Sequence, residues 1–342
     1  MLRKILLAIL TILTLALAFI ASFPSAGFVR DMSMWSGIAH FLAFARIAGI
    51  ALSLLGVLIV ISAGLLRRRR RAGSHQNGGA LVLGLVWFVL DVLLGIAPQG
   101  FFAQQEQASL AKGSSRELTL VSYNSQDTLS AEDLRFFNDQ YGADVYVFPE
   151  GGVANVQAAV SGAGLQGKVF EPESQDFSLA HSVQVAPTTI FVRNSMSDVH
   201  QETAYPFSFG STQVSFAGAG AFSLIGLHTA PPLPSLMGNW RSDLALVNDI
   251  DQSVSGQEPL IVAGDFNAAL RHGSLANLNN LSDAAMLAGN DDGTWPSDVL
   301  PLFSSPIDHV LVSSKIRVEN LETVKVGEGD HRAVIAELGI FE

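Results

Sequence analysis

The chain has 342 residues, of which 49% are hydrophobic and only 15% are charged. Soluble globular domains carry about 25% charged residues, so this composition excludes one uniformly soluble domain. Residues 1–111 hold nine Lys and Arg against three Asp and Glu, a balance of +6. Residues 112–342 hold eleven against twenty-eight, a balance of −17, and the two parts give the net charge of −11. We therefore expect a membrane part followed by an acidic globular part.

The same numbers exclude several kinds of site. Because the chain contains no cysteine, it has no disulfide framework, no thiolate zinc site and no cysteine nucleophile. The acidic part is long enough for a large core, but its negative charge would repel polyanions. Stable, sequence-independent binding of nucleic acid is therefore not expected. The oligomeric state is left open.

Three apolar stretches, at about 5–22, 44–66 and 80–97, predict a membrane domain over residues 1–97. Each approaches the ~20 residues that a helix needs to cross ~30 Å of hydrocarbon. The first stretch could instead be a cleaved signal peptide, because it follows Arg3 and Lys4 and ends near small residues. Its length favours a membrane span, so three transmembrane helices are predicted.

The orientation follows from five consecutive arginines, Arg67–Arg71, between the second and third stretches. Positively charged loops stay on the cytoplasmic side, which also places the N-terminus in the cytoplasm. The third span then leads outward. The sequence thus predicts a multi-pass protein of the cell membrane, with the bilayer as a partner and everything after about residue 98 outside the cytoplasm.

Two ionisable residues, Arg46 and Asp91, lie within or beside the predicted spans. A functional intramembrane site is one interpretation of such residues. We favour a structural ion pair, since no further polar residue accompanies them. Residues 98–116 are polar and small and are predicted to be a linker, which would span roughly 25 Å if flexible.

The outer part, residues 117–342, alternates short apolar runs with helical patterns. Many of the runs are continuous, which is typical of strands buried on both faces. Ser130 followed by Glu132 and Asp133 predicts a helix start, and residues 234–252 predict a longer helix. Strands mixed with helices, without strict alternation, indicate a layered α/β sandwich. The predicted strands are 118–123, 144–148, 188–192, 213–217, 222–227, 260–263, 309–313 and 333–336.

Polar side chains flank these runs in a way that predicts a shared cleft, because strand ends on a rigid scaffold can present side chains to one site. Taken singly, each has an ordinary explanation: Asp265 and Asn267 are turn formers, and a lone histidine is more often a cap or a solvated residue. Their recurrence at strand ends favours function. The residues are Asn124, Glu150, His228, Asp265, Asn267, Asp308, His309, Asp330 and His331.

At these residues the sequence resembles the endonuclease/exonuclease/phosphatase superfamily, which includes deoxyribonucleases, inositol polyphosphate phosphatases and bacterial sphingomyelinases. The resemblance covers essentially all of residues 117–342. It implies a four-layer α/β (α+β) sandwich of two packed mixed sheets flanked by helices. The motifs, in the order of the family, are Ser122-Tyr123-Asn124, residues 144–150, Leu227-His228-Thr229, Gly264-Asp265-Phe266-Asn267, Gly293-Thr294-Trp295-Pro296, Ile307-Asp308-His309 and Gly329-Asp330-His331-Arg332.

The resemblance also implies roles in a metal-dependent hydrolysis of phosphate bonds. Glu150 would be the principal ligand of Mg²⁺ or Mn²⁺, with Asn124 beside it and Asp330 supporting a second metal. Asp265 would activate the attacking water, and Asn267 would position the water and the phosphate. His331, held by Asp308, would stabilise the transition state as a cation, and His228 would hydrogen-bond a phosphate oxygen. A carboxylate beside an imidazole favours the charged ring.

Two residues depart from the family pattern. Pro149 stands where the family often has glutamine before its glutamate, and Gln126 stands where several nuclease members carry an acid. The second departure argues against a second metal on that side.

An outward phosphohydrolase tethered to the membrane is expected to act on a phosphate-containing small molecule or lipid. Some bacterial relatives of this layout are associated with glycopeptide-antibiotic resistance, which implies a lipid-linked (polyprenyl) pyrophosphate as the substrate. The alternatives are an extracytoplasmic nuclease or phospholipid phosphodiesterase, and a catalytically silent, membrane-tethered binding protein. A binding protein has no use for the water-activating Asp265.

Overall fold

A computed structural model of the chain describes residues 2–69, 82, 84–88, 116–172, 178–254, 258–290 and 292–341. The chain divides into two compact units. One comprises Met1–Gln104 with Leu270–His272, and the other comprises Gln105–Ala269 with Gly273–Glu342. All strands of the described residues belong to the second unit.

The first unit is helical, with α1 (Leu2–Ser22), α2 (Gly27–Ser33), α3 (Ser36–Ala43) and α4 (Ala45–Arg69). Within α4, the segment Ala45–Ser62 is long and apolar enough to cross a membrane, with a mean hydropathy of 2.2 and only 17% of it buried. The segments Thr11–Ser22 and Gly27–Ser33 qualify only together, as one span bent by 103°. Pro24 lies in the break between them, and proline lacks the N–H group that would continue the helical hydrogen bonds.

The described residues therefore support one membrane-spanning helix, or two if the bent pair is a single span, and not the three that the sequence predicted. The predicted span at 44–66 coincides with α4. Only residues 82 and 84–88 of the predicted span at 80–97 are described, and they are helical. Asp91 and the predicted linker up to residue 115 lie outside the described residues.

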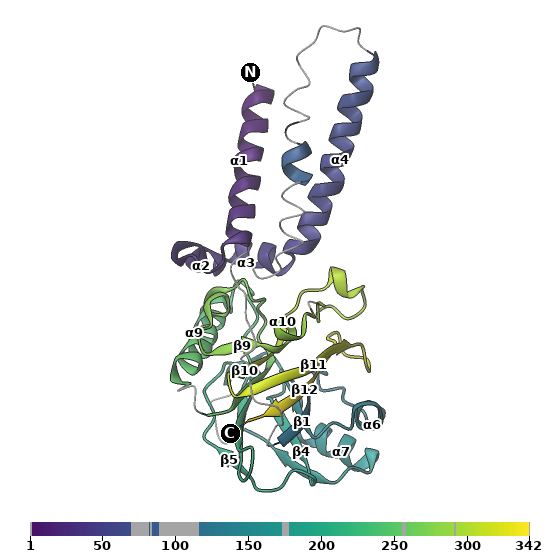
Figure 1. Cartoon of the computed structure of the whole chain (residues 1–342), viewed down its shortest axis with the longest axis vertical. Coiled ribbons are helices and arrows are strands. Elements are labelled where there is room, and N and C mark those ends of the chain that lie inside the picture. Colours follow the sequence, from purple (N-terminus) through teal and green to yellow (C-terminus); the bar gives the residue numbers. More distant parts are fainter. Residues whose placement is uncertain are drawn as a thin grey trace. The chain divides into compact units, whose positions relative to one another are not determined.

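The strands of the second unit form two six-stranded sheets (Figure 1). In each sheet one pair of strands is parallel, β1 with β2 and β7 with β8, and the other pairs are antiparallel. The first sheet has the order β11 (Ile316–Val324), β12 (Ala333–Ile340), β1 (Arg116–Ser122), β2 (Val145–Phe148), β4 (Thr189–Arg193) and β3 (Gly167–Phe170). The second has the order β5 (Val199–Glu202), β6 (Ser211–Phe216), β7 (Phe222–His228), β8 (Leu260–Asp265), β10 (Asp308–Ser313) and β9 (Leu281–Asp283).

The main core lies between the two sheets, where Leu120 and Val147 of the first sheet belong to the same buried cluster as Leu224 and Ala263 of the second. The sheets approach closely at Gly226, where an added Cβ would lie 2.9 Å from Val147 Cγ1. Helices cover the outer faces (Figure 1). They are α6 (Ala131–Tyr141), α7 (Val153–Ala163) and α9 (Met237–Ser253), with the shorter α8 (Ser178–Ser182), α10 (Ala284–Ala288), η2 (Gly273–Asn277) and η3 (Pro301–Phe303).

The fold predicted for this part, two packed mixed sheets flanked by helices, is confirmed. The predicted start of α6 is also confirmed in detail. The Ser130 side chain accepts a hydrogen bond from the Asp133 backbone, and the Asp133 side chain accepts one from the Ser130 backbone. This reciprocal capping satisfies two backbone N–H groups at the start of α6 that would otherwise have no partner.

Candidate active site

The first pair of candidate side chains follows two adjacent strands. Because β1 and β2 are parallel, Asn124 and Glu150 leave the same edge of the first sheet. The Asn124 Nδ2 group donates a hydrogen bond of 3.0 Å to Glu150 Oε1, and Asn124 Oδ1 accepts one of 3.0 Å from the Gln126 N–H. These partners orient the buried amide so that its nitrogen faces the carboxylate.

The loop that carries Glu150 is held by Asp127. Glu150 has a φ of 53°, a region that non-glycine residues rarely occupy. The Asp127 N–H donates to Glu150 O at 2.8 Å, and Asp127 Oδ1 accepts from the Gly152 N–H at 2.8 Å. Asp127 thus supports the loop that positions Glu150, and such strained backbone tends to occur at functional sites.

The second group of side chains leaves the matching edge of the other sheet. His228 at the end of β7 pairs in register with Asp265 of the parallel strand β8. Asp308 on β10 pairs with Asp265 from the other side. Gly264 has a φ of 146°, and a Cβ there would lie 2.0 Å from Leu227 O. Only glycine therefore lets β8 approach β7 closely enough to bring the three side chains together.

The two edges meet in one site. Asn124 Nδ2 donates a second hydrogen bond, of 3.1 Å, to Asp265 Oδ2, so this amide bridges the two sheets. His228 Nε2 lies 3.5 Å from Asp265 Oδ2 and 3.9 Å from Glu150 Oε1. Residues far apart in the sequence thus converge on a single point between the carboxyl ends of the two parallel strand pairs.

Asn267 completes this side of the site. Its backbone, with a φ of 45°, donates from N–H to Asp265 Oδ1 at 2.8 Å. Its Nδ2 donates to Thr229 O at 3.0 Å and lies 3.2 Å from His228 Nε2. Burial lowers the pKa of His228, so its ring is neutral and Nε2 accepts from Asn267. His228 Nδ1 has no hydrogen-bond partner among the described residues.

His331 differs from His228 in its charge. Its Nδ1 donates a 2.8 Å hydrogen bond to Asp308 Oδ2, and its Nε2 lies 3.7 Å from Asp265 Oδ2. Burial alone would lower the pKa of His331, but the charges of Asp308 and Asp265 outweigh burial and raise the pKa to about 10. The ring is therefore a cation at neutral pH, with Nε2–H directed toward the centre of the site.

Several oxygens of the site are suited to a divalent cation. Burial raises the pKa of Glu150 and that of Asp265, and the charge of Asp308 raises the latter further. Asp308 Oδ1 and Asp330 Oδ1 are buried without a hydrogen-bond partner among the described residues. Carboxylate and amide oxygens are the ligands that Mg²⁺ prefers, so this donor set fits such an ion.

Asp265, Asp308 and His331 also form a group whose ligand atoms lie within 4.8 Å of one another. A protonated imidazole has no lone pair for a metal. We therefore interpret His331 and Asp308 as a hydrogen-bonded pair and not as ligands of an ion.

Asp330 is less central than the other predicted residues. Its Oδ2 accepts a 2.9 Å hydrogen bond from Trp295 Nε1, and its Oδ1 lies 3.7 Å from His331 Nε2. The side chain is 42% exposed, whereas that of His331 is 7% exposed. One of the two Asp330 oxygens is thus already engaged by the loop that contains Trp295.

Two residues named in the sequence analysis have roles that were not predicted: Thr294 supports a strand start, and His309 does not join the shared cleft. Thr294 Oγ1 accepts from the backbone N–H groups of Ile307 and Asp308, at 3.1 and 3.2 Å, and so positions the start of β10. His309 forms a second buried pair with Asp283, at 2.8 Å, and its Nε2 contacts Ala268 O at 2.8 Å. Successive side chains of a strand point to opposite faces, which separates His309 from Asp308. This alternation was the signal available in the sequence.

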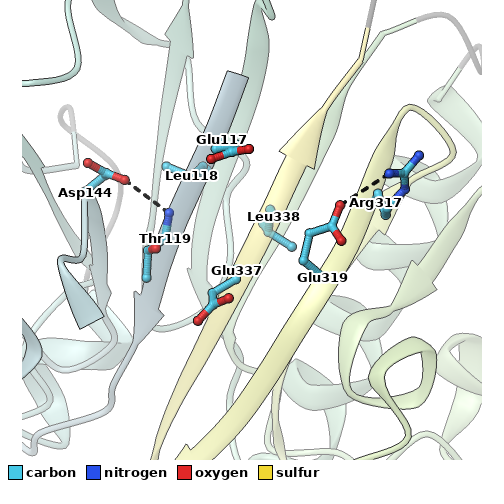
Figure 2. A pocket seen from close by; sticks show the side chains of 8 residues that line it. All are labelled: Glu117, Leu118, Thr119, Asp144, Arg317, Glu319, Glu337 and Leu338. Atoms are coloured by element: carbon cyan, nitrogen blue, oxygen red, sulfur yellow. Dashed lines mark hydrogen bonds and ion pairs between the residues drawn. The ribbon is translucent and has the colours of Figure 1, made fainter. Parts of the chain in front are cut away.

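A groove of about 560 Å³ opens at the other end of the first sheet (Figure 2). It is lined near the starts of β1 and β11 and the end of β12, whereas the candidate site follows the end of β1. Its charged side chains are mostly acidic and include Glu117, Asp144, Glu319 and Glu337, with Arg317 paired to Glu319 at 3.5 Å. The groove is therefore separate from the candidate active site.

Comparison with known proteins supports the family that the sequence resembles. A model of the endonuclease/exonuclease/phosphatase family matches residues 136–331, more than half of the chain. No curated protein matches the chain. Among solved structures, a D. rerio TDP2 humanized by 14 mutations is 16% identical, with a TM-score of 0.51, and the match covers 66% of this chain and 100% of that chain. At this identity the likeness shows the fold alone.

Two further solved structures have TM-scores just below 0.5. An endonuclease/exonuclease/phosphatase from Bacteroides vulgatus is 18% identical, with a TM-score of 0.49, covering 66% of this chain and 99% of that chain. A mannosyl-6-phosphatase from Bacteroides thetaiotaomicron is 16% identical, with a TM-score of 0.48, covering 65% and 99%.

Proposed function

The chain belongs to the endonuclease/exonuclease/phosphatase family, whose members hydrolyse phosphate esters, and from this premise we propose a membrane-anchored, metal-dependent phosphohydrolase with an outward-facing catalytic domain. The observation that carries the proposal is the convergence at Asn124. This one amide donates to Glu150 Oε1 of one sheet edge and to Asp265 Oδ2 of the other. A cationic His331 lies next to them, 3.7 Å from Asp265.

Glu150 would be the principal metal ligand, with Asn124 beside it and Asp330 supporting a second ion. When bound, a divalent cation supplies charge stabilisation for a phosphate and lowers the pKa of a bound water. Asn124 meets Glu150 through its nitrogen, so its amide would have to turn in order to offer an oxygen. The ion would be Mg²⁺ or Mn²⁺.

The remaining residues would orient the attacking water, take its proton and bind the phosphate oxygens. Asp265, whose Oδ1 is held by the Asn267 N–H, would accept the proton of the attacking water. His331 would donate from Nε2–H to the phosphate oxygen on which negative charge grows, and its hydrogen bond to Asp308 would keep it charged and oriented. His228 and Asn267 would contact the other phosphate oxygens, and for this His228 would have to carry its ring proton on Nε2, the atom that accepts from Asn267 in the structure. Donors that are already in place at the developing charge lower the barrier without reorganisation.

The test of the metal role is the Glu150→Gln variant together with chelation. The substitution keeps the shape and the acceptor for Asn124 but removes the charge, so turnover with Mg²⁺ should be lost while the unfolding temperature stays close to that of the wild type. The measurement is phosphate release and thermal unfolding on the same preparations. Turnover of the wild type that survives a chelator would contradict the metal mechanism.

The proposed substrate is a lipid-linked pyrophosphate, such as a polyprenyl pyrophosphate. Two features support it: α4 contains a segment apolar enough to cross a bilayer, and the acidic balance of residues 112–342 disfavours a polyanion such as DNA. A phosphate group at a membrane surface would lie within reach of a tethered domain.

The outward orientation is proposed from Arg67–Arg71 at and beyond the end of α4, because positively charged loops remain in the cytoplasm. It requires the chain to cross the bilayer once more after Arg71, at the predicted span 80–97. A reporter enzyme that works only outside the cytoplasm, fused after Glu342, should be active. A matched fusion after Arg71 should be inactive and serves as the control. Activity of the reporter after Arg71 but not after Glu342 would reverse the topology.

A further inference from the structure

The described part of the second unit exposes few large apolar side chains, and most of them lie in one short segment. The exposed ones are Val183, Leu233, Val299, Leu300, Leu302 and Phe303. Four of the six thus fall within Val299–Phe303, here called the apolar loop. Leu300 is 66% exposed and Leu302 45%. A cluster of this kind on a folded domain marks an interaction surface.

The apolar loop is also free of charge. No Asp, Glu, Lys or Arg lies between Asp298 and Asp308, and the flanking Ser304 and Ser305 are buried. A charged side chain is costly to place in hydrocarbon, and this segment offers none. Its composition therefore fits an occupant that is itself apolar.

The loop is exposed and yet rigidly held. The buried guanidinium of Arg332 donates to Gly293 O, Ser304 Oγ and Ser297 O at 3.1, 2.8 and 2.9 Å, and also to Pro296 O and Val299 O. All of these acceptors lie in or beside the loop. Because the loop is already ordered, docking would cost little further conformational entropy.

The same contacts attach the loop to the candidate site. Arg332 directly follows His331, and Trp295 Nε1 donates to Asp330 Oδ2 at 2.9 Å. The Ser297 N–H donates to Asp330 O, at 2.6 Å. The apolar loop therefore belongs to the rim of the site that contains His331, and whatever binds the loop also lies close to that site.

We propose that the apolar loop docks on the hydrocarbon surface of the bilayer and so brings the mouth of the candidate site to the membrane. This inference rests on the proposed function, because it needs the chain to be anchored. The anchor, α4, carries a membrane-compatible segment, so a bilayer is the apolar partner that is always within reach. The acidic charge of residues 112–342 gives no attraction to anionic headgroups, so apolar contact must provide the attachment.

The absence of cysteine from the chain allows a direct test with single labels. The full chain with Leu300→Cys, labelled with nitrobenzoxadiazole, is reconstituted into phosphatidylcholine vesicles with or without brominated acyl chains. We expect a blue-shifted emission that the brominated lipid quenches. Leu302→Cys is a second reporter, and since both side chains are exposed, neither substitution should disturb folding.

Two control labels separate the possible outcomes. Leu58→Cys, on the exposed side of α4, should be quenched if the chain is anchored, and Glu319→Cys, in the groove of Figure 2, should not. Emission from residues 300 and 302 that matches residue 319 while residue 58 is quenched would overturn the docking and leave the anchoring intact. A blue shift without lipid quenching would overturn it in favour of contact with a second copy of this chain. Unquenched emission from residue 58 would remove the anchoring and the docking together.

Discussion

Replacement of Asp265 by asparagine is expected to lower turnover by about 10²–10⁴-fold, the usual contribution of a general base. The side chain keeps its shape, and an amide oxygen can still accept from the Asn267 N–H, which is 2.8 Å from Asp265 Oδ1. What is lost is the ability to take a proton from water, together with the acceptor that Asp265 Oδ2 offers to Asn124 Nδ2 at 3.1 Å. The measurement is kcat for phosphate release with Mg²⁺ present.

Stability should not follow activity in this variant. Burial and the neighbouring Asp308 raise the pKa of Asp265, so its charged form is unfavourable in the folded protein. The neutral asparagine removes that cost but gives up the buried hydrogen bond from Asn124 Nδ2, so the two effects oppose each other and the unfolding temperature should change little. If Asp265→Asn kept the turnover of the wild type, Asp265 would not be the general base, and the assignment of this residue would be wrong.

Asp251 provides a matched control. It is a buried aspartate on α9, and its carboxylate accepts hydrogen bonds from the backbone N–H groups of Asn279, Asn280 and Leu281. It has no contact with the candidate site. Asp251→Asn should lower the unfolding temperature and leave kcat unchanged, which is the opposite of the result expected for Asp265→Asn.

Removal of the His331 imidazole should have the second large effect. A charged hydrogen bond to a developing oxyanion is worth about 3–4 kcal/mol, or roughly 10²–10³-fold in kcat, so His331→Ala should lower kcat more than it raises KM. Asp308→Asn should cost less, because the ring remains but loses its orienting charge. The double variant should be barely worse than His331→Ala, since the two residues act as a unit. Additive losses would contradict the pairing.

The pH dependence gives an independent readout. The pKa of His331 is raised from its ordinary 6.5 to about 10 in the folded protein. Its contribution to stability is therefore fully present below about pH 6.5, and it is lost as the pH rises through about 10. Turnover should fall over the same alkaline range. His309→Gln removes the other buried imidazole–carboxylate pair. It should lower the unfolding temperature but leave the fall of turnover at alkaline pH unchanged.

The central strands could be predicted because they are buried on both faces. β2 and β10 are buried along their whole length, and continuous apolar runs of this kind stand out in the sequence. The edge strands β3 and β5 could not be predicted in this way. They are four residues each and mostly half-buried or exposed, so neither forms a continuous apolar run in the sequence.

The candidate site could be predicted as far as its residues but not as far as its geometry. Asn124, Glu150 and Asp265 follow or end strands, and parallel strands bring such residues to one edge. No sequence pattern reveals that the Asn124 amide bridges the two sheets, or that Trp295 engages Asp330, because these contacts join segments far apart in the sequence. Hydropathy likewise detects the apolar run of α1 but not the bend of 103° that follows it.

The measurement that tests the account most directly is hydrolysis by the detergent-solubilised full chain of a prenyl pyrophosphate, a phospholipid, an inositol phosphate and DNA, with Mg²⁺ or with a chelator. Phosphate release follows the prenyl pyrophosphate and the inositol phosphate, and separation of the cleaved products follows the phospholipid and the DNA. The account predicts Mg²⁺-dependent hydrolysis that is greatest for the prenyl pyrophosphate and is lost in Asp265→Asn. Cleavage of DNA or of the phospholipid alone would confirm that the protein is a hydrolase but contradict the proposed pyrophosphate substrate. A folded wild-type protein that hydrolyses none of the four compounds would contradict the proposed phosphohydrolase.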